Sequence, residues 1–122
     1  HSEYHYKHEP ILFGWKEGGD RLKNSDREKT TVWDFKRPKK SSKHPTMKPL
    51  KMWAFGIKTH SKNQDVLYEP FLGSGTTMIA CQQLNRKCYG MELDERYCQV
   101  IIDRMLNSFP ELEVKVNGED YK

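Results

Sequence analysis

The sequence predicts an α/β fold of the Rossmann-like kind, in which parallel strands alternate with helices. Residues 65–77 form the organising stretch, with a short apolar run, a proline, two glycines and two threonines. Residues 86–92 are interpreted as a second strand that ends in an acid, and residues 77–85 between the two have helical spacing. This order predicts a parallel β-α-β unit that binds a ligand beyond the carboxyl ends of its strands.

The first strand and the turn after it follow from simple residue preferences. Residues 66–68 are apolar with strand character, and Pro70 ends the run because proline has no amide hydrogen to donate. Gly73 and Gly75 allow a tight turn and let a ligand approach the backbone closely. The threonines then open a helix whose first amides lack helical partners, so its start favours an anionic or strongly polar ligand group.

The acid that ends the second strand narrows the class of ligand. Glu92 lies 19 positions after Gly73, where nucleotide-binding units place a carboxylate that grips ribose hydroxyls. Met78 stands where the dinucleotide fingerprint has its third glycine, so a smaller nucleoside is favoured and NAD is a distant alternative. No Gly-Lys-Ser/Thr sequence is present, which excludes the phosphate loop of ATPases.

The residues before the central unit predict two strands, a loop and a helix. Residues 10–16 and 31–35 are aromatic-rich and are interpreted as short strands, separated by a loop of mixed charge. Residues 36–43 carry five cations and no acid, which suits either phosphate contact or a solvated loop. Thr46 can cap a helix that tolerates Pro49 in its first turn and runs on to about residue 60.

The residues after Glu92 predict an amphipathic helix and a short terminal strand. Residues 94–107 have helical spacing, and Pro110 prevents the helix from continuing. Residues 111–116 alternate with period two, and Asn117-Gly118 is a turn signal.

Composition sets outer bounds on the class of protein. The 122 residues carry a net charge of +4 and an isoelectric point of about 8.9, which permits nucleic-acid contact without proving it. Three cysteines without a Cys-x-x-Cys pair indicate reduced cytosolic thiols, and neither a membrane span nor a signal peptide is predicted. His1, His5 and His8 could share a helix face, but without further ligands at suitable spacing no metal site is predicted.

Three motifs together resemble the amino-group DNA methyltransferases, which methylate adenine N6 or cytosine N4. Residues 69–77 (Glu-Pro-Phe-Leu-Gly-Ser-Gly-Thr-Thr) and 90–97 (Gly-Met-Glu-Leu-Asp-Glu-Arg-Tyr) are similar to that family's S-adenosylmethionine (SAM) site. Residues 44–49 (His-Pro-Thr-Met-Lys-Pro) resemble the segment that precedes it in the sub-group whose SAM-binding half comes last. The resemblance covers about residues 5–106, and Glu69 stands where the family usually has aspartate.

The resemblance implies a three-layer, Rossmann-like SAM-dependent methyltransferase fold that is incomplete in this chain. Residues 1–122 are expected to be the C-terminal SAM-binding part, with 17–43 as a basic and polar loop region. The family's catalytic tetrapeptide contains Pro-Pro, which this sequence lacks, so we expect it upstream of His1 and expect the chain alone to be inactive. The length and the non-methionine first residue also favour a piece of a larger domain.

The resemblance also implies the site residues and partners. The cofactor is SAM, and the partners are DNA and either a second copy or the missing catalytic segment, in a cytoplasmic protein of bacterial or phage type. The cofactor site is expected at His44, Thr46, Lys48, Glu69, Pro70, Phe71, Gly73, Ser74, Gly75, Thr76, Met91, Glu92 and Leu93. DNA contact is expected at Lys36, Arg37, Lys39, Lys40 and Lys43.

Several alternatives remain open at this level. Thr46 and Lys48 also fit a plain helix cap and a surface charge, and Phe13 and Trp15 fit either a target-base pocket or core packing. A non-catalytic or partner-dependent SAM-binding module is the second hypothesis. A methyltransferase for RNA or a small molecule is the third.

Overall fold

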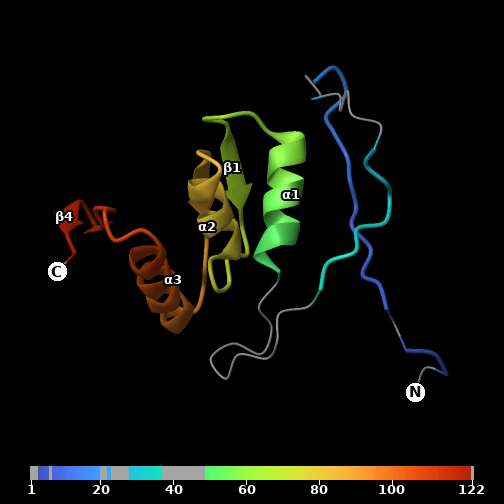
Figure 1. The fold of residues 1–122 in the computed structure, drawn as a ribbon. Helices are drawn as coiled ribbons and strands as arrows, with labels where there is room; N and C mark the ends of the chain where they lie inside the picture. The colour runs from blue at the N-terminus through green and yellow to red at the C-terminus, as the bar shows by residue number, and fades with distance from the viewer. Residues whose placement is uncertain (1–2, 6, 20–21, 23–27, 37–48, 122) are drawn as a thin grey trace.

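The computed structural model describes residues 3–5, 7–19, 22, 28–36 and 49–121. Helices and strands are confined to the last of these ranges, which contains the predicted β-α-β unit (Figure 1). No helix among the described residues is long and apolar enough to cross a membrane. In chain order the elements are α1 (Leu50–His60), β1 (Val66–Glu69), α2 (Thr76–Gln83), β2 (Lys87–Gly90), α3 (Glu95–Ser108), β3 (Lys115–Val116) and β4 (Glu119–Asp120).

The central unit has the predicted parallel topology. β1 pairs with β2 in parallel, with Val66 opposite Lys87 and Glu69 opposite Gly90. Parallel neighbours need a crossover connection, and α2 supplies it. The ladder continues beyond the strands, where the amide of Met91 donates to the Glu69 carbonyl at 2.9 Å. The prediction of two parallel strands joined by a helix is therefore confirmed, although β2 ends at Gly90, two residues before the acid.

The core lies between the two-stranded sheet and the helices α1 and α2, which run side by side in Figure 1. Ile57 of α1 and Ala80 and Cys81 of α2 are buried at its centre. Leu67 and Cys88 reach the same cluster from the inner face of the two strands. Apolar burial on this face is the main force that holds the unit together.

A polar network fixes the loops at the amino ends of the strands. The Arg86 guanidinium donates to the Ser61 carbonyl at 2.8 Å and to the Ser61 hydroxyl at 3.1 Å, and also bonds the Leu84 carbonyl. Gln64 and Asn85, both in the left-handed region, are joined by backbone and side-chain hydrogen bonds. These contacts set where each strand starts, and therefore which residues arrive at the other end.

The opposite face of the sheet is open within the described residues. Val66, Tyr68 and Tyr89 point to that face and are 59%, 65% and 64% exposed. Among those residues β1 also has no neighbour except β2, so its outer edge carries unpaired backbone groups. The described part of the chain is thus a helix layer on a half-open sheet.

The two strands expected before the central unit are not formed. Residues 10–16 and 31–35 run as extended chain beside α1, without a ladder partner in the described residues. An isolated extended segment becomes a strand only when another backbone satisfies its amides and carbonyls. Leu12 and Val32 remain 98% and 78% exposed. The prediction of strands at these two segments is therefore wrong for the described residues, because composition alone does not supply a ladder partner.

The elements after the sheet follow the prediction closely. α3 begins after Asp94, whose carboxylate accepts from the Arg96 amide at 2.9 Å as an N-cap. The expected terminal strand shortens to β3, which pairs antiparallel with β4. Asn117 and Gly118 form the two-residue turn between them, with φ of 53° and 87°. This left-handed pair is the turn that an Asn-Gly sequence favours.

Candidate nucleotide-binding site

The turn between β1 and α2 requires glycine at two positions. Gly73 and Gly75 have φ of +54° and +81°, a left-handed conformation that residues with a side chain rarely adopt. Gly75 is also the N-cap of α2, and a Cβ there would lie 3.0 Å from Cγ1 of Ile101. The turn is therefore closed on the α3 side at Gly75, whereas a Cβ at Gly73 would meet only the Phe71 carbonyl oxygen, at 4.0 Å.

Glu69 ends β1 and braces the turn that follows it. Its Oε1 accepts from the amide of Phe71 at 3.0 Å, and its Oε2 accepts from the Thr77 hydroxyl at 3.2 Å. The side chain is half-buried, so these bonds hold a carboxylate at the carboxyl end of the strand. Its two oxygens retain acceptor capacity beyond these two bonds.

Glu92 joins the second strand to the glycine turn. Its Oε2 accepts from the Gly73 amide at 2.7 Å, although the two residues are 19 positions apart. Its Oε1 accepts from the Asp94 amide at 2.9 Å, which orients the carboxylate. An ionised carboxylate has about four acceptor positions, so hydroxyl donors can still be received. The acid and the turn, predicted to share one site, are in direct contact.

Large apolar side chains lie next to these carboxylates in the sequence and face solvent. Phe71 is 87% exposed and Leu93 is 100% exposed, and both flank the two carboxylates in sequence. Met91 is also exposed, and its sulfur accepts from the Tyr68 hydroxyl at 3.0 Å. Exposed apolar groups gathered beside polar ones are typical of a ligand site. Their flat or flexible surfaces suit a planar base.

The structure brings together only the predicted cofactor residues that lie between Glu69 and Leu93. Pro70, Ser74 and Thr76 are in the turn or at the start of α2, and Thr76 is buried. The remaining cofactor residues and most of the basic run fall outside the described residues: His44, Thr46, Lys48, Arg37, Lys39, Lys40 and Lys43. Lys36 is described and exposed. α1 begins at Leu50 with Pro49 as its N-cap, so the helix starts later than a cap at Thr46 would give.

Two contacts at the site were not predicted. The Thr77 hydroxyl bonds Glu69, and Arg104 of α3 bonds Ser74 in the turn. The signal for Arg104 was available in the helical spacing, because an arginine sits on the inward stripe of an otherwise apolar face. Its partner could not be found in the sequence, since 30 positions separate the two residues.

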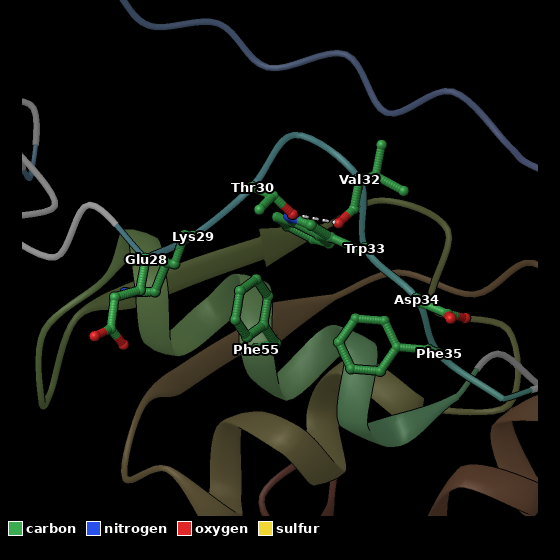
Figure 2. A pocket seen from close by; sticks show the side chains of 8 residues that line it. All are labelled: Glu28, Lys29, Thr30, Val32, Trp33, Asp34, Phe35 and Phe55. Atoms are coloured by element: carbon green, nitrogen blue, oxygen red, sulfur yellow. Dashed lines mark hydrogen bonds between the residues drawn. The ribbon is translucent and has the colours of Figure 1, made fainter.

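A separate hollow lies away from this junction, on the outer side of α1 (Figure 2). Its volume is about 370 Å³, and its floor is formed by Trp33, Phe35 and Phe55. The Trp33 and Phe55 rings meet edge to face with centroids 4.8 Å apart. Phe13 and Trp15, considered above for a base pocket, do not line it, and Phe13 packs on His60 instead. None of the predicted cofactor residues that the structure describes contributes to this hollow.

The cysteines of the core are not candidate nucleophiles. Burial raises the pKa of the Cys81 thiol to about 12, and burial also raises the pKa of Cys88. A nucleophilic cysteine needs a lowered pKa, so both groups stay protonated near neutral pH.

This fold is an α/β unit in which a glycine turn and two carboxylates meet at the carboxyl ends of parallel strands, the place where such sheets bind ligands. Residues 2–103 match the family described as DNA methylase, whose model covers the N6/N4 methyltransferases. The chain belongs to this family.

Individual relatives agree with the family match. The chain is 32% identical to the type II methyltransferase M.SmaI of Serratia marcescens over 105 residues, which is 86% of this chain and 35% of that protein. It is 31% identical to the M1.HpyAVI–SAM complex, with a TM-score of 0.61 over 70% of this chain and 44% of that one. TTHA0409 of Thermus thermophilus, complexed with SAM, is 34% identical with a TM-score of 0.51, over 56% and 27%. The chain spans about a third of the length of the curated relatives it matches.

Proposed function

We propose that this chain supplies the SAM-binding part of an enzyme that methylates an exocyclic amino group of a DNA base, adenine N6 or cytosine N4. The observation that carries the proposal is the 2.7 Å hydrogen bond between the Gly73 amide and Glu92. It joins the glycine turn and the ribose-type acid at the carboxyl edge of a parallel pair. The relatives whose complexes contain SAM support the choice of cofactor.

The residues present fit SAM in their chemistry. Glu92 has acceptor positions left for ribose hydroxyls, and Met91 and Leu93 beside it offer apolar surface to the adenine ring. The bare backbone at Gly73 and Gly75 lets the methionine part approach closely.

The amino-acid end of the cofactor needs charged partners of its own. Glu69 offers acceptor capacity to the cofactor's ammonium group, directly or through water. His44, Thr46 and Lys48 remain our proposal for the carboxylate, because a hydroxyl and a cation near a helix start suit an anion. When bound, SAM supplies a methyl group that its sulfonium activates for direct displacement. The role of this chain is to hold that methyl in line with the target nitrogen.

DNA is proposed as the macromolecular partner on charge and family grounds. The net charge is +4, and residues 36–43 contain five cations without an acid. Such cations bind phosphates and position the duplex, whereas base contacts would read its sequence. Binding should therefore weaken steeply as salt is raised.

The open side of the sheet favours a second segment that completes the enzyme. The outer edge of β1 and the exposed side chains Val66, Tyr68 and Tyr89 form an unpaired edge and an uncovered apolar face within the described residues. We propose that the catalytic segment, which carries the Pro-Pro tetrapeptide, packs here. A second copy of this chain is the competing occupant. A partner-dependent SAM-binding module is accordingly the second candidate function.

Methyl transfer from labelled SAM tests the proposal. The 122-residue chain alone should bind SAM but transfer no methyl to duplex DNA. Adding a polypeptide with the family's catalytic tetrapeptide should restore transfer to DNA and not to RNA. Turnover by the chain alone would refute the division of labour. Labelling of RNA in preference to DNA would refute the substrate class.

A further inference from the structure

We infer that Arg104 of α3 is a positioning residue for the glycine turn, an inference that rests on the proposed role of that turn in holding SAM. The Arg104 Nη1 donates to the Ser74 carbonyl and to the Ser74 hydroxyl, the latter at 3.0 Å. Ser74 stands between Gly73 and Gly75, the two glycines that adopt the left-handed conformation. One guanidinium therefore holds the backbone at the tip of the turn.

The hydrogen bond to the Ser74 carbonyl fixes more than one atom. That carbonyl and the Gly75 amide belong to the same peptide unit, which is planar. At the opposite edge of this peptide unit, the Gly75 amide donates to the Leu72 carbonyl at 2.9 Å. Arg104 and Leu72 thus hold the two ends of one peptide, and its orientation sets how the chain turns into α2.

A second residue of α3 supports the same point. Ile101 is buried against Gly75 and lies three positions before Arg104, so both side chains extend from one helix face. α3 therefore contacts the turn twice, with an apolar group at Gly75 and a cation at Ser74. Through these two contacts α3 supports the turn from the side opposite to the proposed ligand.

The location of this cation is not explained by helix stability. The start of α2 already carries a partial positive charge, and a further cation near it is unfavourable. Burial lowers the pKa of Arg104, which reflects a cost of removing the guanidinium from water. Its acceptors at Ser74 are neutral oxygens. The turn geometry that Arg104 maintains accounts for an arginine at this position.

The test compares two ligands on three variants of the 122-residue chain. S-adenosylhomocysteine contains the amino-acid tail, whereas 5′-methylthioadenosine shares the nucleoside but lacks that tail. Arg104→Met should weaken S-adenosylhomocysteine about tenfold, as expected for loss of a charge-assisted hydrogen bond, and weaken 5′-methylthioadenosine less than about threefold. Arg104→Lys, which keeps the charge but not the fork of donors, should lose an intermediate amount. Arg96→Met is the control, because Arg96 is exposed on the same helix and, among the described residues, its guanidinium pairs with the neighbouring Asp94.

The possible outcomes separate this inference from the proposed function. If the unaltered chain fails to bind S-adenosylhomocysteine, the proposed function fails and the inference with it. If it binds but the Arg104 variants bind equally well, only the inference is overturned. An equal loss for both ligands would assign Arg104 to general stability and would also overturn it. If Arg104→Met does not fold, the ratio of the two affinities in Arg104→Lys decides. Faster hydrogen exchange at the Gly75 amide in that variant is the expected accompanying result.

Discussion

Replacing Glu92 by alanine should weaken binding of S-adenosylhomocysteine by about 2–4 kcal/mol, or roughly 30- to 700-fold. The magnitude corresponds to two charge-assisted hydrogen bonds from ribose hydroxyls to a half-buried carboxylate. The variant also loses the bonds from Glu92 to the amides of Gly73 and Asp94, which lie at 2.7 and 2.9 Å. Part of any loss could therefore come from a loosened turn and not from a lost ribose contact.

A double-mutant cycle separates these two contributions. Adenosine and 2′,3′-dideoxyadenosine differ only in the ribose hydroxyls, so their affinity ratio reports contacts to those hydroxyls. The unaltered chain should prefer adenosine, and Glu92→Ala should bind both compounds equally. Isothermal titration or ligand-observed NMR measures the ratio at a temperature where thermal melts show both proteins folded.

Glu95→Ala provides the matched control for this cycle. Glu95 is an exposed acid in the first turn of α3, three positions beyond Glu92, and makes no contact with the turn that the structure describes. Its removal should leave both affinities unchanged. If Glu92→Ala keeps the preference for adenosine, the ribose is not held by Glu92 and the proposed cofactor geometry is wrong.

Three further predictions concern the scaffold. Gly75→Ala should destabilise the chain by about 1–3 kcal/mol in urea unfolding, because φ is +81° and the new methyl would lie 3.0 Å from an α3 side chain. The control Gly14→Ala should be nearly neutral, because a methyl there meets no atom within 4 Å. Arg86→Met should lower the free energy of unfolding by about 1–3 kcal/mol, because it removes the hydrogen bonds that join two loops. Arg96→Met, at an exposed site, should lower it far less, and equal losses would refute the role of the network. Folding raises the pKa of Cys81 from 9.0 to about 12, so the free energy of unfolding should fall as pH rises from 9 towards 12. Cys81→Ala should lose the part of this decrease that Cys81 contributes. Identical pH profiles for the two proteins would contradict the assignment.

Local sequence signals predicted the part of the fold that is locally determined. Pro70, the paired glycines and the apolar runs on either side fix a strand, a turn and the start of a helix within residues 66–77. The Asn117-Gly118 turn was equally predictable, because few residues adopt two successive left-handed conformations. The closeness of the glycine turn and Glu92 was predictable as well, since a β-α-β crossover brings the ends of its two strands together.

Features that depend on distant partners were not predictable in the same way. Residues 10–16 have strand composition, yet a strand needs a neighbour that the described residues do not supply. The contact between Arg104 and Ser74 depends on how α3 returns over the turn, which no local preference encodes. The roles of Thr46 and Lys48 remain predictions from the motif alone.

The central claim is that SAM lies over the glycine turn with its ribose held at the end of β2. A structure of the chain bound to S-adenosylhomocysteine tests this claim most directly. It should show both ribose hydroxyls within hydrogen-bonding distance of the Glu92 carboxylate and the homocysteine tail over Gly73 and Gly75. A ligand bound at the aromatic hollow beside α1, or one whose ribose points away from Glu92, would contradict the account.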